Sequence, residues 1–288
     1  MAVHFNYHFA DMHINNFFTI DNLSVMASST TKNLVVATRI HLGNAAMAPS
    51  SEYLRTTIDS FSSFGESINA TQTLIAADAS PKFDGYDLIE VLRSLTECTN
   101  ITVIPVTPWN NFVPALNAII SEASGSDFCL IVSAETFVSP ASVGKLLAHL
   151  DETTLVAGGV LPGHDYFPHT IQPLNGRTAP WNTLCVWNVP LLSLTGFPLV
   201  ADGVHAGRDG SPGVSGVEEV STIAVLQRIL GADNAKAKLV PLSDVTWETD
   251  FADTVRKEWH ERKMTSKIER SARHLELLCL SGIVHHLG

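Results

Sequence analysis

Positive charge is scarce in this sequence. Only 18 lysine and arginine residues stand against 29 aspartate and glutamate residues, which gives a formal net charge of −11. Proteins that bind nucleic acid through a broad surface need clustered positive charge. The charge balance therefore predicts that nucleic acid is not a partner.

Cysteine and long apolar runs are scarce as well. The four cysteines are scattered without a C-x-x-C pair: Cys98, Cys129, Cys185 and Cys279. Because Cys129 and Cys279 lie in apolar runs, buried thiols in a reducing compartment are favoured over disulfides or zinc ligands. No apolar stretch approaches the roughly 20 residues of a membrane-spanning helix. The sequence thus predicts a soluble, cytoplasmic protein without a transmembrane segment.

The first part of the chain has no lysine or arginine before Lys32. Secretory and organellar targeting peptides carry positive charge, so this composition counts against both. We expect residues 1–32 to be a loosely ordered N-terminal extension, with an edge strand near residues 17–20 as the alternative.

From Asn33 onward, apolar runs of strand length alternate with segments of helical periodicity. The runs lie at residues 34–37, 73–77, 101–106 and 128–132, and the helical segments at 52–61, 86–95, 113–123 and 140–150. This alternation implies right-handed β-α-β crossovers and a mainly parallel sheet. We expect the α/β class, with a single Rossmann-like domain over residues 33–245.

The stretch from Gly125 to Pro140 is the expected centre of that sheet. Phe128–Val132 is a continuous apolar run, typical of a strand buried on both faces. Small and acidic residues up to Glu135 follow it, and Pro140 suits the first turn of a helix. Ligands of open α/β sheets bind outside the carboxyl ends of such strands. Glu135 is therefore a candidate to meet a ligand or a metal, and a capping or solvent-facing acid is the alternative.

The pattern changes after Asp151. Further strands are expected at residues 155–160, 184–189 and 239–242, and a helix at 217–230. Residues 201–216 form a Gly-rich loop, and a loop of this length in a compact domain is usually functional or disordered.

Residues 246–288 are expected to form a helical C-terminal tail. Its apolar side would be formed by Phe251, Val255, Trp259, Ile268, Ala272, Leu275 and Cys279. The tail also concentrates positive charge, at Arg256, Lys257, Arg262, Lys263, Lys267, Arg270 and Arg273. A solvated helix face is one interpretation. A surface that faces a diphosphate or a partner, including a second copy of the chain, is the other.

Three segments carry a resemblance to a known family. A Gly-x-x-x-Ala-x-Asn-Ala helix start is matched by Asn111, Ala115, Asn117 and Ala118. Residues 126–150 look like a strand, an Asp-x-Asp turn and a Pro-led helix, and residues 216–219 look like a Gly-x-Glu-Asp element. Between Asn33 and Leu242 the chain thus resembles the GT-A glycosyltransferases of the family-2 type. The resemblance implies a GT-A fold that transfers a sugar from a nucleotide diphosphate.

The resemblance also implies a divalent cation, Mn²⁺ or Mg²⁺, held against the donor diphosphate. The Asp-x-Asp turn has become Ser133-Ala134-Glu135, so Glu135 is the carboxylate left in it. Hard cations commonly bind through one or two carboxylates together with phosphates and water. Ser133 would contribute through its hydroxyl or a water. The family often adds a later histidine, for which His205 and His260 are candidates.

A catalytic base is implied at the Gly-x-Glu-Asp element. Glu219, and after it Glu218, would take the proton of the acceptor hydroxyl as the nucleophile attacks. An acid at a helix N-terminus is also favoured by the helix dipole whatever its role, so a structural role for both stays open.

The resemblance also implies that the nucleotide binds at the carboxyl ends of the first two strands. Thr38 and Arg39 after the first strand and Asp78 after the second are the candidates, together with Asn117 and Ser133. Loop capping is the alternative for Asp78. The acceptor region of the family corresponds to residues 164–187, where Trp181, Trp187, His164, Asp165 and His169 are candidates and core packing is the alternative.

These observations predict a glycosyltransferase, inverting because no covalent nucleophile is suggested, that uses a nucleotide-diphosphate sugar and an acceptor the sequence does not identify. Two alternatives stay open. One is a nucleotidyltransferase on a related fold, and the other is an inactive descendant that binds ligands or acts as a scaffold.

Overall fold

The computed structural model describes residues 32–42, 48–109, 112–205, 213–247, 258, 261–262 and 264–288. Apart from Lys32, the predicted N-terminal extension lies outside these residues. So do Asn111 and His260. No helix in the described part of the chain is long and apolar enough to cross a membrane.

Most strands belong to one nine-stranded sheet of order β3-β2-β1-β4-β8-β6-β11-β13-β7. In chain order these strands are β1 (Leu34–Ile40), β2 (Gln72–Asp78), β3 (Ile101–Val106), β4 (Phe128–Val132), β6 (Thr154–Gly159), β7 (Thr170–Pro173), β8 (Leu184–Asn188), β11 (Lys236–Val240) and β13 (Ile283–His286). Two short pairs lie outside the sheet, β5 (Thr136–Val138) with β12 (Val245–Trp247) and β9 (Gly203–Val204) with β10 (Val214–Ser215).

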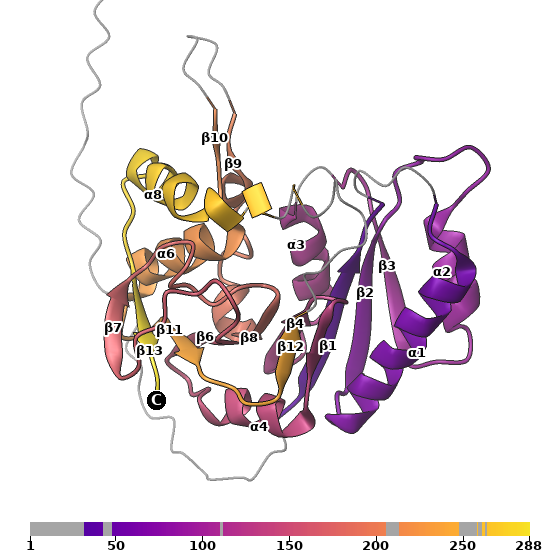
Figure 1. Cartoon of the computed structure of the whole chain (residues 1–288), viewed down its shortest axis with the longest axis horizontal. Helices are drawn as coiled ribbons and strands as arrows, with labels where there is room; N and C mark the ends of the chain where they lie inside the picture. Colours follow the sequence, from indigo (N-terminus) through magenta and orange to yellow (C-terminus); the bar gives the residue numbers. More distant parts are fainter. Residues whose placement is uncertain are drawn as a thin grey trace, which may run out of the picture. The chain divides into compact units, whose positions relative to one another are not determined.

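Helices separate many of these strands along the chain, although β6, β7 and β8 follow one another without a helix (Figure 1). They are α1 (Ser51–Ser67), α2 (Leu88–Thr96), α3 (Val113–Glu122), α4 (Pro140–Ala148), α5 (Val189–Leu192), α6 (Glu218–Leu230) and α8 (Lys267–Leu277), with the 3-10 helix η1 (Leu199–Asp202). Ser50, Asp87 and Ser139 cap α1, α2 and α4 by accepting backbone N–H groups of the first turn. Such caps satisfy donors that have no partner within the helix.

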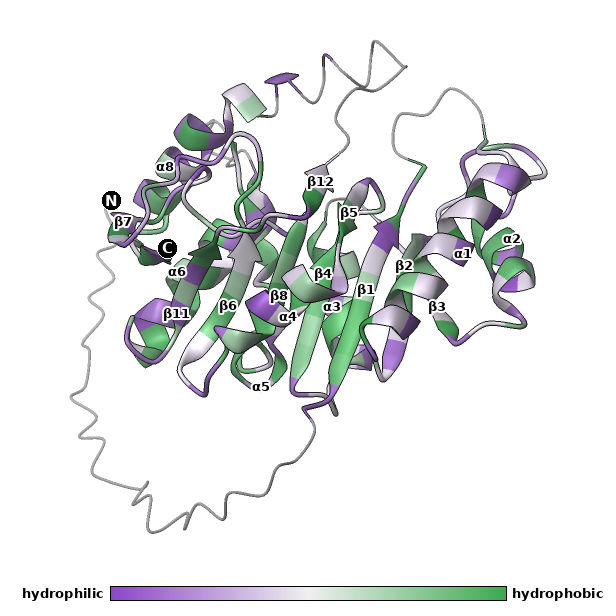
Figure 2. Cartoon of the chain, turned by 60° about the horizontal axis from the view of Figure 1, so that its bottom comes forward, coloured by the Kyte–Doolittle hydropathy of each residue, from purple (hydrophilic) through white to green (hydrophobic). Residues whose placement is uncertain are grey.

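The sheet is mostly parallel, as predicted. Strand β1 pairs in parallel with both β2 and β4, and β11 pairs in parallel with β6 and β13. The reversed strands are β8, between β4 and β6, and β7, against β13. Figure 2 shows the central strands as hydrophobic along most of their length.

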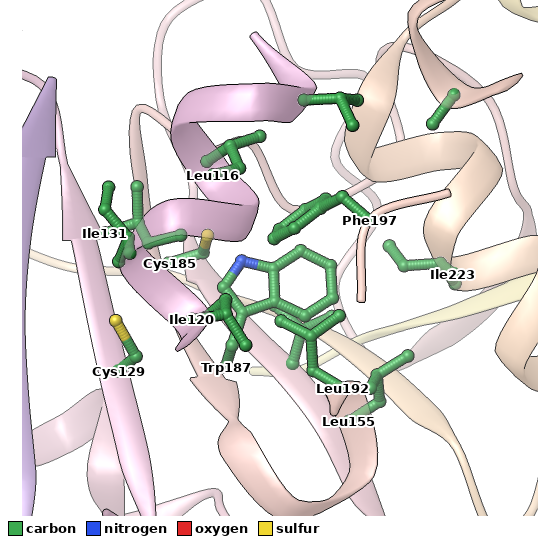
Figure 3. Packing of buried hydrophobic residues seen from close by; sticks show 14 of the residues in the cluster. Leu116, Ile120, Cys129, Ile131, Leu155, Cys185, Trp187, Leu192, Phe197 and Ile223 are labelled. Atoms are coloured by element: carbon green, nitrogen blue, oxygen red, sulfur yellow. The ribbon is translucent and has the colours of Figure 1, made fainter. Parts of the chain in front are cut away.

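Alternate residues of β1, β2, β4 and β8 face two separate cores. In β1, Val35 and Ala37 pack with α3, α5, α6 and α8, whereas Leu34 and Val36 pack with α1, α2 and α4. The period of two in a strand makes this division unavoidable for a sheet covered on both faces. Trp187 of β8 lies at the middle of the first core, surrounded by side chains of α3, α5 and α6 (Figure 3).

The described part of the C-terminal tail is helical at α8, but the chain then returns to the sheet as β13. The sequence analysis did not predict this strand, because its four residues, Ile283–His286, end in two histidines and show no long apolar run. The predicted apolar side of this segment is wrong at Ile268, Ala272 and Cys279, which are exposed, whereas Leu275 is buried as predicted. The buried side is formed by Lys267, Ser271, His274 and Leu275.

Leu116 tests the α3 core. Its side chain is fully buried, and Leu116→Ala should lower the free energy of unfolding by about 2–5 kcal/mol, since a cavity adds to the lost transfer energy. Leu194, which is 60% exposed, supplies the matched control. Leu194→Ala should change the free energy by less than about 0.5 kcal/mol in the same urea titration. Equal losses for the two variants would contradict the described core.

Candidate active site at the carboxyl edge of the sheet

The strand order reverses between β1 and β4. From β1 the chain moves outward to β2 and β3, and it then crosses back to place β4 on the other side of β1. The carboxyl ends of two such strands border the crevice in which open α/β proteins bind ligands. The register pairs Ala37 with Ile131, so Arg39 and Ser133 each lie two residues further toward this edge.

Strand β1 is longer than predicted. It runs to Ile40, so Thr38 and Arg39 belong to the strand rather than to the loop after it. Thr38 is 1% exposed, and its hydroxyl has no hydrogen-bond partner within the described residues. Both positions still lie at the carboxyl end of the strand, where the sequence analysis expected a ligand.

Arg39 is held by an aromatic ring and an acid. Its guanidinium carbon lies 4.7 Å from the ring centroid of Phe112, and Nη1 lies 3.9 Å from Oε1 of Glu218. At that distance the contact with Glu218 is ionic rather than a hydrogen bond. Nη1 is buried and has no hydrogen-bond partner in the described part of the chain. The guanidinium therefore has a nitrogen donor that no hydrogen bond within the described residues uses.

The turn after β4 brings Ser133 and Glu135 together. The Ser133 hydroxyl donates to Oε2 of Glu135, and the Ser133 N–H donates to the carbonyl of Thr183 at 2.9 Å. Both side chains are half-buried. The turn in which the sequence analysis expected a metal thus holds two side-chain oxygens that are hydrogen-bonded to each other at the carboxyl end of β4.

The two acids that begin α6 lie in different environments. The Glu218 side chain is 14% exposed and faces Arg39. The Glu219 side chain is 4% exposed, and its Oε1 lies 3.1 Å from Nζ of Lys267. Burial raises the pKa of Glu219, the Lys267 ammonium opposes that rise, and Glu218 adds to it. Glu218 is the more accessible of the two carboxylates.

Asp202 is a charged neighbour that the sequence analysis did not select. Its carboxylate accepts the backbone N–H groups of Phe112 at 3.2 Å and Val113 at 3.3 Å, and so caps α3 from a distant part of the chain. Burial, followed by the nearby Glu218 carboxylate, raises the pKa of Asp202 to about 6. In the sequence, the only indication of a role for Asp202 was its place as an acid in a Gly-rich loop.

Asp78, the last residue of β2, lies beside a hollow. Its Oδ1 accepts the N–H of Ser80 at 2.9 Å, which is the capping role considered as the alternative. The same residue helps to line a hollow of about 100 Å³ between the end of β2 and the start of α2. A larger open depression of about 560 Å³ shares Pro81, Tyr86 and Asp87 with it. The two roles of Asp78 are compatible, because its second oxygen is not used in the turn.

Three other candidates have structural contacts. The amide of Asn117 is bonded at both ends to the backbone of Phe197, whose N–H donates to Oδ1 at 2.8 Å and whose carbonyl accepts from Nδ2 at 2.9 Å. Trp181 and Trp187 are 1% and 0% exposed, and both belong to the core. The core alternative for these tryptophans is therefore the one the structure supports.

The histidine candidates are dispersed. His205 is exposed and follows β9, next to residues outside the described part of the chain. His164 is stacked on Trp181 with the ring centroids 3.7 Å apart, and burial lowers its pKa to about 3. Among the described residues, no cluster of three or more His, Cys, Asp or Glu could hold a metal ion.

Two of the comparisons with known proteins found nothing. No family model matches the chain, and no curated protein matches it.

Solved structures show weak likenesses. S. aureus TarS 1–349 is 14% identical with a TM-score of 0.37, over 57% of this chain and 49% of that one, so the match spans about half of its length. The 4-diphosphocytidyl-2C-methyl-D-erythritol synthase of Anaerococcus prevotii is 12% identical with a TM-score of 0.44, over 80% and 97% of the two chains. The inositol-1-phosphate CTP transferase of T. maritima is 10% identical with a TM-score of 0.40, over 83% and 96%. Likenesses of this size assign no activity, and the α/β class rests on the sheet topology itself.

Replacement of Asn117 should affect stability more than ligand binding. Asn117→Ala leaves the N–H and carbonyl of the buried Phe197 unpaired, which should cost about 1–3 kcal/mol of unfolding free energy. Asn234→Ala, which removes an exposed bond to the carbonyl of Leu230, is the control and should cost less than about 0.5 kcal/mol. Chemical denaturation measures both, and an undiminished stability of Asn117→Ala would contradict the described contact.

Asp202 should make stability depend on pH. Its folded pKa of about 6 exceeds the ordinary aspartate value of 3.8, so between these values the folded protein keeps a proton that the unfolded chain has released. The unfolding free energy should therefore fall as the pH rises from about 4 to about 6. Asp202→Asn should reduce this slope, whereas Asp59→Asn on the exposed side of α1 should leave it unchanged. Parallel profiles for parent and Asp202→Asn would show that Asp202 does not titrate in this range.

Proposed function

We propose that the protein is a glycosyltransferase that binds a nucleotide-diphosphate sugar across the carboxyl ends of β1 and β4. The observation that supports this most directly is the position of Arg39 and the Ser133–Glu135 turn at adjacent strand ends, beside the reversal of strand order. One group carries positive charge and the other carries paired oxygen ligands. A metal-bound diphosphate requires both kinds of group.

Arg39 is suited to a phosphate oxygen. A guanidinium offers planar donors that match phosphate geometry, and it stays charged at any physiological pH. Phe112 lies against its face, and Nη1 has no hydrogen-bond partner within the described residues. The contact with Phe112 holds the group in place without using its N–H donors.

The hollow beside Asp78 is suited to the nucleoside. It lies at the end of β2, the strand next to β1, and Tyr86 contributes an aromatic side chain to its lining. A carboxylate accepts hydrogen bonds from ribose hydroxyls, and an aromatic face stacks on a base. A nucleotide placed here would have its diphosphate toward Arg39.

Ser133 and Glu135 would hold a divalent cation, Mn²⁺ or Mg²⁺. Because the described residues contain no cluster of three metal ligands, the fit is to a cation that takes its remaining ligands from the diphosphate and water. When bound, such a cation would neutralise the charge that develops on the leaving diphosphate. His205 stays a candidate for a further ligand.

Glu218 is the better candidate for the base. A base must reach the proton it abstracts, and the Glu218 side chain is more exposed than that of Glu219. It would accept the proton of an acceptor hydroxyl as the hydroxyl attacks the donor sugar. The preference of the sequence analysis for Glu219 as the base is reversed in this proposal, because Glu219 is buried against Lys267.

Calorimetry with a panel of nucleoside diphosphates, triphosphates and sugar nucleotides, with and without Mn²⁺, tests the function. Glu135→Gln keeps the side-chain shape but removes the charge, so it should weaken Mn²⁺-dependent binding by more than about tenfold, or roughly 1.4 kcal/mol. Glu152→Gln, an exposed acid outside the site, is the matched control. Ser133→Asp should strengthen metal-dependent binding by restoring paired carboxylates.

Three outcomes separate the possibilities. Preference for a sugar nucleotide supports the glycosyltransferase, and preference for a triphosphate supports a nucleotidyltransferase. Absence of binding by every compound would leave a scaffold as the explanation. Unchanged binding by Glu135→Gln, with no effect of Mn²⁺ on the parent, would contradict the metal role.

A further inference from the structure

Lys267 begins α8 and lies inside the protein rather than on its surface. Its side chain is 8% exposed, and Nζ lies 3.1 Å from Oε1 of Glu219 and 3.8 Å from the ring centroid of Trp181. Figure 1 shows α8 and α6 on the same side of the sheet, and residues of the two helices are in contact. The sequence analysis offered a solvated face as one interpretation of this basic segment. For Lys267 that interpretation is wrong.

The surroundings of Lys267 fix its position. The indole N–H of Trp181 donates to the carbonyl of Gly176 at 2.7 Å, and the Gly176 N–H donates to the Ser271 hydroxyl at 2.9 Å. A Cβ at Gly176 would lie 2.4 Å from the carbonyl oxygen of Lys267, so only glycine allows this approach. The loop before β8 and the start of α8 are thus closely packed against each other beside the Lys267 ammonium group.

Two ion pairs lie side by side on the first turn of α6. Glu218 faces Arg39 of β1, and Glu219 faces Lys267 of α8. The other charged or titratable groups that act on this cluster are Asp202 of η1, Arg270 of α8, Cys185 of β8 and His164. Each ion pair is neutral as a unit, so Glu219 adds no net negative charge beside Arg39.

We propose that Lys267 is a positioning residue for the candidate active site: it neutralises Glu219, so that the charged groups of this cluster that remain for the diphosphate and the acceptor are those of Arg39 and Glu218. This inference rests on the proposed function, because it concerns the same site. It assigns to the C-terminal segment of the chain a direct role in the charge balance of that site.

The physical reason is the cost of an unpaired buried charge. A buried carboxylate without a partner either takes up a proton or destabilises the fold. Burial raises the pKa of Glu219 and lowers that of Lys267, and the opposite charge of the partner opposes each of these shifts. If Lys267 only attached α8 to α6, an apolar side chain of similar length would serve equally well. A variant without the lysine charge therefore distinguishes neutralisation of Glu219 from simple attachment of α8 to α6.

Lys267→Met removes the charge and keeps the length of the side chain. At low pH Glu219 would be protonated, the cluster would again be neutral, and affinity for a nucleoside diphosphate should match that of the parent. As the pH rises, Glu219 would ionise without a partner, and its charge would repel the diphosphate. As Glu219 ionises with rising pH, we expect the affinity of Lys267→Met to fall about tenfold relative to the parent, an effect of the size expected for one nearby charge.

The controls isolate Glu219. Lys267→Met with Glu219→Gln lacks both charges and should follow the pH profile of the parent, and Arg273→Met, an exposed position on the same helix, should do the same. The measurement is calorimetric titration with the nucleoside diphosphate that binds the parent most tightly. If Lys267→Met gives a profile parallel to that of the parent, or if the double variant behaves like Lys267→Met, the inference is overturned.

A second measurement needs no ligand. The raised pKa of an unpaired Glu219 means that the folded state of Lys267→Met keeps a proton that the unfolded chain has lost. Its unfolding equilibrium should therefore shift toward the unfolded state by up to about tenfold per pH unit above about pH 5, until Glu219 ionises. The double variant should show no such change. A Lys267→Met profile that follows the double variant would overturn the inference.

The two measurements distinguish this inference from the proposed function. A parent that binds no nucleotide overturns the proposed function and the role of Lys267 at the site, while the unfolding profiles still show whether Lys267 holds the charge of Glu219. A parent that binds nucleotide with a parallel Lys267→Met profile overturns this inference alone.

Discussion

The pairing of β4 with β1 on one side and β8 on the other is the constraint on which the rest of the structure depends. All five residues of β4 are buried, so their backbone groups must be satisfied by neighbouring strands. The parallel neighbour aligns the carboxyl ends of β1 and β4, and the antiparallel neighbour brings Thr183 to the same edge, where its carbonyl accepts the Ser133 N–H. Burial of the apolar side chains of β4 thus sets the positions of the neighbouring strands, and these positions bring the polar groups at the strand ends together.

Charge at this edge follows one rule, which is that a buried ion has a partner. Arg39 and Glu218 form one pair, and Lys267 and Glu219 form the other. The consecutive acids of α6 differ because successive helical residues point in directions about 100° apart. The Glu218 carboxylate thus stays partly exposed beside Arg39, while that of Glu219 is enclosed with Lys267, whose ammonium lies over Trp181. The different environments of these two glutamates therefore follow from helix geometry and not from residue type.

Several residues that the sequence suggested as functional make contacts that stabilise the fold. Asn117 holds the backbone of Phe197, and Trp187 fills the core between β8 and α3 (Figure 3). Asp202, which had no distinct pattern in the sequence, caps α3 and carries a raised pKa beside Glu218. The contacts that reveal the structural roles of Asn117 and Asp202 join residues about 80 to 90 positions apart in the chain.

The sequence by itself determined the alternation of strands and helices from β1 to α4, because burial on both faces and helical periodicity are local patterns. It predicted β3 and β4 with their observed bounds, Ile101–Val106 and Phe128–Val132. It also located Arg39, Ser133, Glu135 and the α6 acids at element ends, although their roles stay proposals. Only the tertiary structure decided that β13 joins the sheet, that Lys267 is enclosed, and that Glu218 pairs with Arg39 while Glu219 pairs with Lys267. These features depend on contacts between distant segments, and such contacts leave no periodic trace in the chain.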